Sequence, residues 1–224
     1  MDTIAECFSQ APIFSKLNEK DRKDLIALAQ QRTYEKGEVI CWQGEPWSMA
    51  AYLASGSAEW AMLSPEGKRQ VVFKLSACDV VWAHSILDDQ PMPASLEAKE
   101  PTLVYLWPRE VILPIISQNI EAVWDVSRVL LGYMRHVREI VYGFAFHPVA
   151  GRLARLLLQH YQPVEGQPAP RNMTLDEMAD AVGTTRELVS RTLHRFAAEN
   201  MIQINRLEFV FTNPAGLEEL AGKT

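Results

Sequence analysis

The sequence lacks the features that mark membrane, exported and disulfide-rich proteins. No apolar run approaches the roughly 20 residues of a membrane-spanning helix, and the opening MDTIAECFSQ does not have the form of a signal peptide. Only three cysteines occur, Cys7, Cys41 and Cys78, and none forms a CxxC pair. This spacing excludes a zinc framework or a four-cysteine iron–sulfur cluster within one chain. We expect buried, unreactive thiols in a cytoplasmic protein.

An excess of positive charge and a catalytic motif are also lacking. The chain has 22 Lys and Arg against 28 Asp and Glu, although a local basic patch is enough for binding nucleic acid. No G-x-S-x-G, phosphate-binding loop or HExxH occurs. Asp88-Asp89 stands before Gln90-Pro91 and is expected to be a solvated turn. The sequence therefore predicts a protein that is not an enzyme.

The first half of the chain is rich in short β-type segments. A helix is predicted over residues 12–31. From Arg32 onward, turns such as KGE, SGS and SPEG separate the runs YEKGEVICWQGEP, MAAYLASGSAEWAML, KRQVVFKL and PTLVYLW. Several short strands at this spacing are typical of an antiparallel barrel or sandwich. Residues 1–114 are therefore predicted to form one β-rich domain.

A long amphipathic helix is predicted over residues 115–147. His147-Pro148 should end it, because proline disfavours helix at the preceding residue, and residues 148–224 should form a second domain. So regular a helix usually pairs with a second copy, and packing onto its own barrel is the alternative; both can hold at once. The apolar repeat of three and four residues consists of Ile120, Val123, Ser127, Leu130, Met134, Val137, Val141 and Phe144.

The segment MTLDEMADAVGTTRELVSRTLHRFAAENMIQI indicates a helix-turn-helix. Two capping boxes are expected, Thr174 with Glu177 and Thr184 with Glu187, each satisfying free N–H groups at a helix start. Between them, Ala181-Val182-Gly183 can form a tight turn, because glycine accepts a positive φ. Two short helices joined by such a turn match the DNA-binding pattern.

The second of these helices has an apolar side and a side suited to DNA. Val189, Leu193 and Phe196 should pack inward. Arginine can donate to guanine and glutamate can accept from cytosine, whereas a solvated face is the alternative. The following IQINRLEFVFTN is typical of a hairpin wing, with Ile202, Ile204, Leu207, Phe209 and Phe211 alternating. The candidate DNA-contacting residues are Thr185, Arg186, Glu187, Ser190, Arg191, His194 and Arg195.

Together these segments resemble the CRP/FNR superfamily of bacterial transcription regulators over nearly the whole chain. The resemblance is carried by KGEVICWQGEP, SPEGKRQVVFKL, HPVAGRLARLL and GTTRELVSRTL. It implies an α+β fold with an N-terminal cyclic-nucleotide-binding-like β-roll (a jelly roll), a dimerisation helix and a C-terminal winged helix-turn-helix. It also implies a homodimer that acts with RNA polymerase. Arg186, Glu187 and Arg191 match base-contacting positions, which implies TGA-containing half-sites in an inverted repeat.

The effector segment departs from cyclic-nucleotide binders of this family. Their Gly-Glu-Leu falls on Val81-Trp82-Ala83 here, and their Arg-Ser or Arg-Thr falls on Met92-Pro93. The arginine that pairs with the cyclic phosphate and the glutamate that holds the ribose are therefore missing. A buried anion without paired donors costs several kcal/mol. We expect cAMP to bind poorly or not at all.

Three alternatives remain for this segment, whose candidate effector residues are Trp82, His84, Met92, Tyr133, Val137 and Arg138. LSACDVVWAHS is similar to a run in haem-based carbon-monoxide sensors of the superfamily, which implies His84 as an axial ligand of haem b sensing CO or NO; His136 and His147 are candidate second ligands. A small organic anion could instead pair with Arg138. In the third alternative Trp82 closes an empty pocket, and control is by redox state or expression level.

Overall fold

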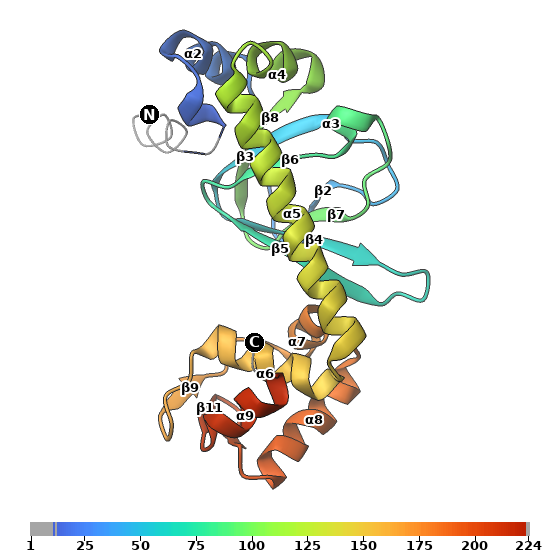
Figure 1. Cartoon of the computed structure of the whole chain (residues 1–224), viewed down its shortest axis with the longest axis vertical. Coiled ribbons are helices and arrows are strands. Elements are labelled where there is room, and N and C mark those ends of the chain that lie inside the picture. Colours follow the sequence, from blue (N-terminus) through green and yellow to red (C-terminus); the bar gives the residue numbers. More distant parts are fainter. Residues whose placement is uncertain (1–10, 12, 223–224) are drawn as a thin grey trace. The chain divides into compact units, whose positions relative to one another are not determined.

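The computed structural model describes Ala11 and residues 13–222, so Cys7 lies outside the described residues. Residues 1–63 and 72–137 form one compact unit, and residues 64–71 and 138–224 form another. Within the described residues, none of the helices has the length and apolar character that crossing a membrane requires. The long helix α5 (Ile120–Phe146) contributes to both units (Figure 1).

The first unit contains two four-stranded sheets, as the β-roll prediction requires. Their strand orders are β1-β8-β3-β6 and β2-β7-β4-β5, and the described pairings are antiparallel. The α+β fold class is thus confirmed. The strands are β1 (Gln30–Tyr34), β2 (Val39–Cys41), β3 (Met49–Ser55), β4 (Ser57–Leu63), β5 (Arg69–Ser76), β6 (Val80–Trp82), β7 (Ser95–Ala98) and β8 (Thr102–Pro108).

Alternation along the strands gives this unit two cores. Successive side chains of a strand point to opposite faces, so Ala51 and Leu53 of β3 face the space between the sheets. Tyr52 of the same strand joins Phe14 and Trp107 in a second core. That core lies under helices α2 (Glu19–Leu28), α4 (Arg109–Ile116) and the first half of α5.

Two helix predictions in this unit need correction. A single helix over residues 12–31 is wrong: η1 (Phe14–Lys16) is one 3-10 turn, and Leu17 is extended. Helix α2 begins only after Asn18, whose side chain accepts a hydrogen bond from the N–H of Asp21 at 2.8 Å. Helix α4 lies mostly in residues expected to be part of the β-rich domain, and the long helix predicted from residue 115 begins only at Ile120. The short α3 (Ser85–Asp88) completes the unit.

The second unit contains the predicted winged helix-turn-helix, which is called the reader from here on. Helix α5 ends at Phe146, and α6 (Val149–Tyr161) follows Pro148, as expected. The predicted two-stranded wing is a three-stranded sheet of order β10-β11-β9, because β9 (Pro168–Pro170) from the proline-rich connector pairs with β11. Proline is tolerated there since β9 is an edge strand. The other elements are α7 (Leu175–Val182), α8 (Arg186–Ala198), β10 (Ile202–Ile204), β11 (Glu208–Phe211) and α9 (Pro214–Ala221).

Candidate nucleic-acid interface and effector region

Local capping fixes both helices of the helix-turn-helix. The capping box of Thr174 and Glu177 is present at the start of α7, as predicted. Gly183 ends that helix with φ +66°, also as predicted, although Val182 is still helical. The second capping box is wrong. Thr185, not Thr184, is the N-cap of α8, and its hydroxyl accepts from the N–H of Leu188 at 3.3 Å.

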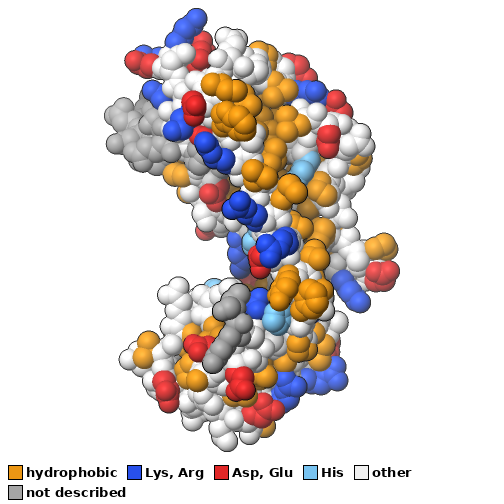
Figure 2. Space-filling model, viewed as in Figure 1, with side chains coloured by type: hydrophobic (Ala, Val, Ile, Leu, Met, Phe, Trp, Pro, Cys, Tyr) orange, Lys and Arg blue, Asp and Glu red, His pale blue; other side chains and the backbone are white. Residues whose placement is uncertain are grey.

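Helix α8 separates a buried side from an exposed side. Val189, Leu193 and Phe196 are at most 2% exposed and join the core of the second unit. The opposite side is suited to reading DNA, and Lys and Arg side chains gather beside α8 in Figure 2. Ser190 is half-buried, and the other predicted contacts are exposed: Thr185, Arg186, Glu187, Arg191, His194 and Arg195.

The charged groups of this face have weak partners that DNA can replace. Arg186 lies 3.1 Å from Asp176 of α7, and Arg195 lies 3.8 Å from Glu199. Exposed ion pairs contribute only about 0–1 kcal/mol. A backbone N–H and the Thr185 hydroxyl lower the pKa of Glu187, so it is an ionised acceptor at neutral pH. The face therefore offers three arginine donors, Arg186, Arg191 and Arg195, and one carboxylate acceptor, Glu187.

The wing carries residues that the sequence did not assign. Leu207, expected in the alternating strand pattern, lies in the turn and is 80% exposed. Arg206 is exposed beside it. Arg171 supports this turn, because its N–H donates to the Leu207 carbonyl at 2.7 Å and its guanidinium lies 5.4 Å from the Phe209 ring. The sequence signal that could have identified Arg206 as a candidate DNA contact was its position as a cation in the tip of the predicted hairpin.

In the β-roll, the structure separates the predicted effector residues. Trp82 is fully buried, but it packs with Phe14 and Tyr52 under the helices. Met92 instead lies between the sheets, where Tyr133 packs against the same core. Trp82 therefore lies in a different core from Met92 and Tyr133. Trp82 belongs to the face of β6 opposite to that of Val81.

An aromatic cluster of five rings occupies the position beside Met92 and is defined by Trp60, Phe73, His84, Tyr133 and His136. Trp60 lies 5.7 Å from His84 and 5.6 Å from Tyr133 between ring centroids. Phe73 lies 4.8 Å from Tyr133 and 4.8 Å from His136. Sequence reasoning missed Trp60 and Phe73, although Trp60 alternates with Ala58 on the inward face of β4.

Hydrogen bonding within the aromatic cluster is incomplete. The Tyr133 hydroxyl donates to the Val80 carbonyl at 3.3 Å, and burial raises the pKa of Tyr133 to about 12, so the hydroxyl is neutral. His136 Nε2 lies 2.8 Å from the Val72 carbonyl. Trp60 Nε1 and His84 Nδ1 are buried without a hydrogen-bond partner. These two nitrogens are the polar groups to which a ligand could bind.

The effector segment, residues 80–94, has no side chain that could bind a cyclic phosphate or a ribose. Residues 80–94 contain no Lys or Arg. Their two carboxylates, on Asp88 and Asp89, are exposed, and Asp89 pairs with Arg109. The buried Ser85 hydroxyl donates to the Gln90 carbonyl at 2.5 Å and accepts from the Trp47 N–H at 3.2 Å. Its hydrogen bonds are thus used in holding the loop.

The two described cysteines are free thiols. Burial raises the pKa of Cys41 to about 12, which keeps it a protonated thiol at neutral pH. Cys78 is half-buried in a turn with φ +73°. The expectation of an unreactive thiol holds for Cys41.

Helix α5 has two apolar faces, and the predicted repeat mixes them. Val123 and Leu130 pack against the β-roll core together with the buried Ala122 and Val126. Val137 is 41% exposed, and Arg138 is exposed with its guanidinium 3.7 Å from Glu139. A separate exposed stripe repeats at three and four residues and is visible along α5 in Figure 2. We define this stripe as Ile120, Trp124, Leu131, Met134 and Val141.

Two family models match the chain. A cyclic nucleotide-binding domain matches residues 31–119, and a Crp-like helix-turn-helix domain matches residues 151–220. They correspond to most of the β-roll and to the reader. Neither describes a catalytic domain.

Curated relatives match across both domains. The chain is 24% identical over 204 residues to the CRP-like cAMP-activated global transcriptional regulator of Mycobacterium tuberculosis, covering 89% of this chain and 91% of the relative. It is 26% identical over 217 residues to the cyclic AMP receptor protein of Thermus thermophilus, covering 94% and 97%.

Solved structures share the fold. A putative regulator of the crp/fnr family from Eubacterium rectale has a TM-score of 0.77 at 19% identity, covering 95% of this chain and 98% of that one. A CooA mutant from Carboxydothermus hydrogenoformans has a TM-score of 0.72 at 20% identity, covering 88% and 90%.

A β-roll, a long helix and a winged helix-turn-helix with an exposed reading face define a DNA-binding transcription regulator with an effector-type domain. Within this class, the chain belongs to the CRP/FNR family of transcription regulators.

Proposed function

We propose that this protein is a homodimeric regulator that reads an inverted repeat of TGA-containing half-sites and acts with RNA polymerase. The observation that carries the proposal is the exposed face of α8, where Arg186, Glu187 and Arg191 project from a fully packed helix. Arginine and glutamate at these positions can read guanine and cytosine edges in the major groove. A dimer with two-fold symmetry requires half-sites about one helical turn, roughly 34 Å, apart.

The exposed stripe of α5 supports the homodimer. Met134 is 69% exposed and Val141 is 58% exposed, although both are apolar. Heptad spacing of apolar side chains is the pattern by which two helices pair. A second copy of α5 would cover this stripe, while the opposite face stays packed on the β-roll.

We further propose that cAMP does not control this regulator, although curated relatives carry that effector in their names. Residues 80–94 provide no cation for the phosphate. An effector can shift the populations of two reader arrangements only through its different affinity for them. The aromatic cluster, which joins β4, β5 and α5, is the part of the β-roll best placed to respond.

The DNA-reading role is tested by Arg191→Ala. We expect this change to weaken binding to the inverted repeat by about 1–3 kcal/mol and to relax selection at one base pair in each half-site. Fluorescence anisotropy with specific and random duplexes, at several salt concentrations, measures both effects. Arg195→Ala is the matched control, since a phosphate contact should weaken binding to both duplexes alike. An equal loss on both duplexes for Arg191→Ala would contradict base reading.

Haem is a candidate effector group because of one observation. His84 Nδ1 is buried without a hydrogen-bond partner, as a nitrogen free to be an axial ligand would be. His136 and His147 have less support as second ligands, because Nε2 of each has a hydrogen-bonding partner. The His84 nitrogen is a suitable axial donor for haem. The rings of Trp60 and Tyr133 fill the neighbouring space, however, and would have to separate to admit it. Bound haem would supply a site for CO or NO.

His84→Ala tests this candidate. We expect the parent protein to give a Soret band after haem reconstitution and the variant to lose it, because the axial nitrogen is removed. His160→Ala, which removes a histidine from the reader, should leave the band unchanged. A colourless parent, or an unchanged band in His84→Ala, would rule out this ligand.

Two other effector hypotheses stand beside haem. A small organic anion has less support, because Arg138 is exposed and close to Glu139. A regulator that needs no effector is favoured by the closed packing of the aromatic cluster, whose ring centroids lie 4.8–5.9 Å apart. Absorbance and mass of whatever co-purifies with the protein separate these hypotheses.

A further inference from the structure

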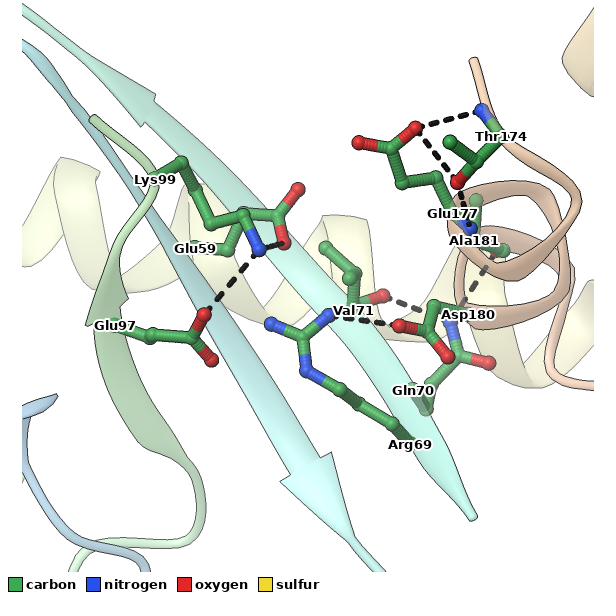
Figure 3. A network of polar contacts seen from close by, with 10 residues as sticks. All are labelled: Glu59, Arg69, Gln70, Val71, Glu97, Lys99, Thr174, Glu177, Asp180 and Ala181. Atoms are coloured by element: carbon green, nitrogen blue, oxygen red, sulfur yellow. Dashed lines mark hydrogen bonds and ion pairs between the residues drawn. The ribbon is translucent and has the colours of Figure 1, made fainter. Parts of the chain in front are cut away.

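The tip of the β4–β5 hairpin, defined as residues 64–71 and including the first three residues of β5, belongs to the same compact unit as the helix-turn-helix. Arg69 of this hairpin tip lies 3.0 Å from Asp180 of α7, and the two side chains are only 21% and 28% exposed (Figure 3). A half-buried pair is screened by solvent less than a surface pair. The attraction between Arg69 and Asp180 is therefore stronger than that of the exposed ion pairs on α8.

Gln70 adds a second contact at the helix-turn-helix turn. Its Nε2 donates to the Ala181 carbonyl at 3.3 Å and to the Val71 carbonyl at 2.7 Å. The hairpin tip fits closely because Gly183 has no side chain: a Cβ there would lie 2.4 Å from Gln70 Oε1 and 2.4 Å from the Phe144 ring. Glycine is thus required by its positive φ and by this approach.

Helix α7, which the hairpin tip contacts, also pairs with Arg186, one of the candidate DNA-contacting residues. Asp176 and Asp180 are four residues apart and share one face of α7. Asp176 pairs with Arg186 of the reading face, and Asp180 pairs with Arg69. With the hairpin tip in contact, the reading side chains of α8 other than Ser190 remain exposed. The contact is therefore compatible with DNA binding.

Strand β5 connects this contact with the aromatic cluster. Arg69 and Phe73 are on the same strand and, four residues apart, on the same face, about 13 Å along it. Phe73 contacts Tyr133 and His136 of α5. Strand β5 therefore contains both the Asp180 contact and a member of the aromatic cluster.

We propose that Arg69 and Gln70 are positioning residues that hold the helix-turn-helix, through Asp180 and the Ala181 carbonyl, in the orientation needed to bind both half-sites. This inference rests on the proposed homodimeric reader. Loss of the contact would leave each reader intact but free to adopt other orientations. Binding to a complete repeat should suffer, whereas binding to one half-site should not.

The test is the ratio of affinities for two duplexes, one with the full inverted repeat selected from a random pool and one with a single half-site. In the full-length protein, we expect Arg69→Ala to lower this ratio about 3- to 30-fold. The double variant Arg69→Asp with Asp180→Arg should restore it to within about threefold of the parent, since the ion pair is re-formed. Lys68→Ala is the matched control, because Lys68 is an exposed cation in the same tip.

The outcomes are distinguishable. An unchanged ratio in Arg69→Ala, or a ratio that stays low in the charge-swapped double variant while its thermal unfolding matches the parent, overturns the inference. Where Arg69→Ala unfolds, Arg69→Gln keeps most of the side chain and gives the same readout. A parent that does not prefer the full repeat over one half-site would contradict the proposed function itself.

Discussion

A Met134→Asp chain is expected to be a monomer that binds an inverted-repeat duplex at least about 100-fold more weakly than the parent. In a homodimer joined through the exposed stripe of α5, the two introduced carboxylates would face one another in an apolar seam. Burying an unpaired charge costs several kcal/mol, and about 2.7 kcal/mol corresponds to 100-fold in affinity. Because Met134 is 69% exposed in the chain itself, the fold should be unaffected.

Gly132→Asp is the matched control for this change. It introduces the same side chain two residues away, about 200° around the helix, where an added Cβ meets nothing within 4 Å. Sedimentation velocity gives the mass of each variant, and anisotropy gives its affinity. A dimeric Met134→Asp chain, or a monomeric Gly132→Asp chain, would argue against the stripe as the dimer contact.

The reader could be predicted from the sequence almost completely because its signals are local. Caps, a turn glycine and a helical repeat all depend on residues within a few positions of one another. The error at the start of α8, Thr184 for Thr185, arose because two adjacent threonines can each cap a helix. Only the backbone conformation shows which hydroxyl reaches the third N–H.

The effector region could not be predicted to the same degree, because its residues meet through tertiary packing. In β6, Val80, Val81 and Trp82 are all apolar and buried, so alternation alone does not show which face of the sheet Trp82 occupies. On α5, the face toward the β-roll and the exposed stripe are both apolar. A repeat of three and four residues fits either face, and the predicted repeat took Val123 and Leu130 from the buried one.

Trp60→Ala is expected to lower the free energy of unfolding of the β-roll by about 3–5 kcal/mol, the usual cost of removing a large buried aromatic side chain. Trp60 is 3% exposed and contacts Phe73, His84 and Tyr133. Thermal unfolding followed by far-ultraviolet circular dichroism, which reports on the backbone, measures the loss of stability. Trp42→Ala is the matched control, because Trp42 is 58% exposed and its removal should change stability little.

The cavity left by Trp60→Ala should bind indole, as apolar cavities in proteins bind aromatic molecules of matching size. Binding to the folded state alone raises stability with ligand concentration, so indole should raise the melting temperature of this variant and not that of Trp42→Ala. Tyr133 and Phe73 link the same rings to α5 and β5. Trp60→Ala should therefore also weaken binding to the inverted repeat, and refilling the cavity with indole should restore that binding. Stabilisation by indole without recovery of DNA binding would separate the packing role of the aromatic cluster from any control of the reader.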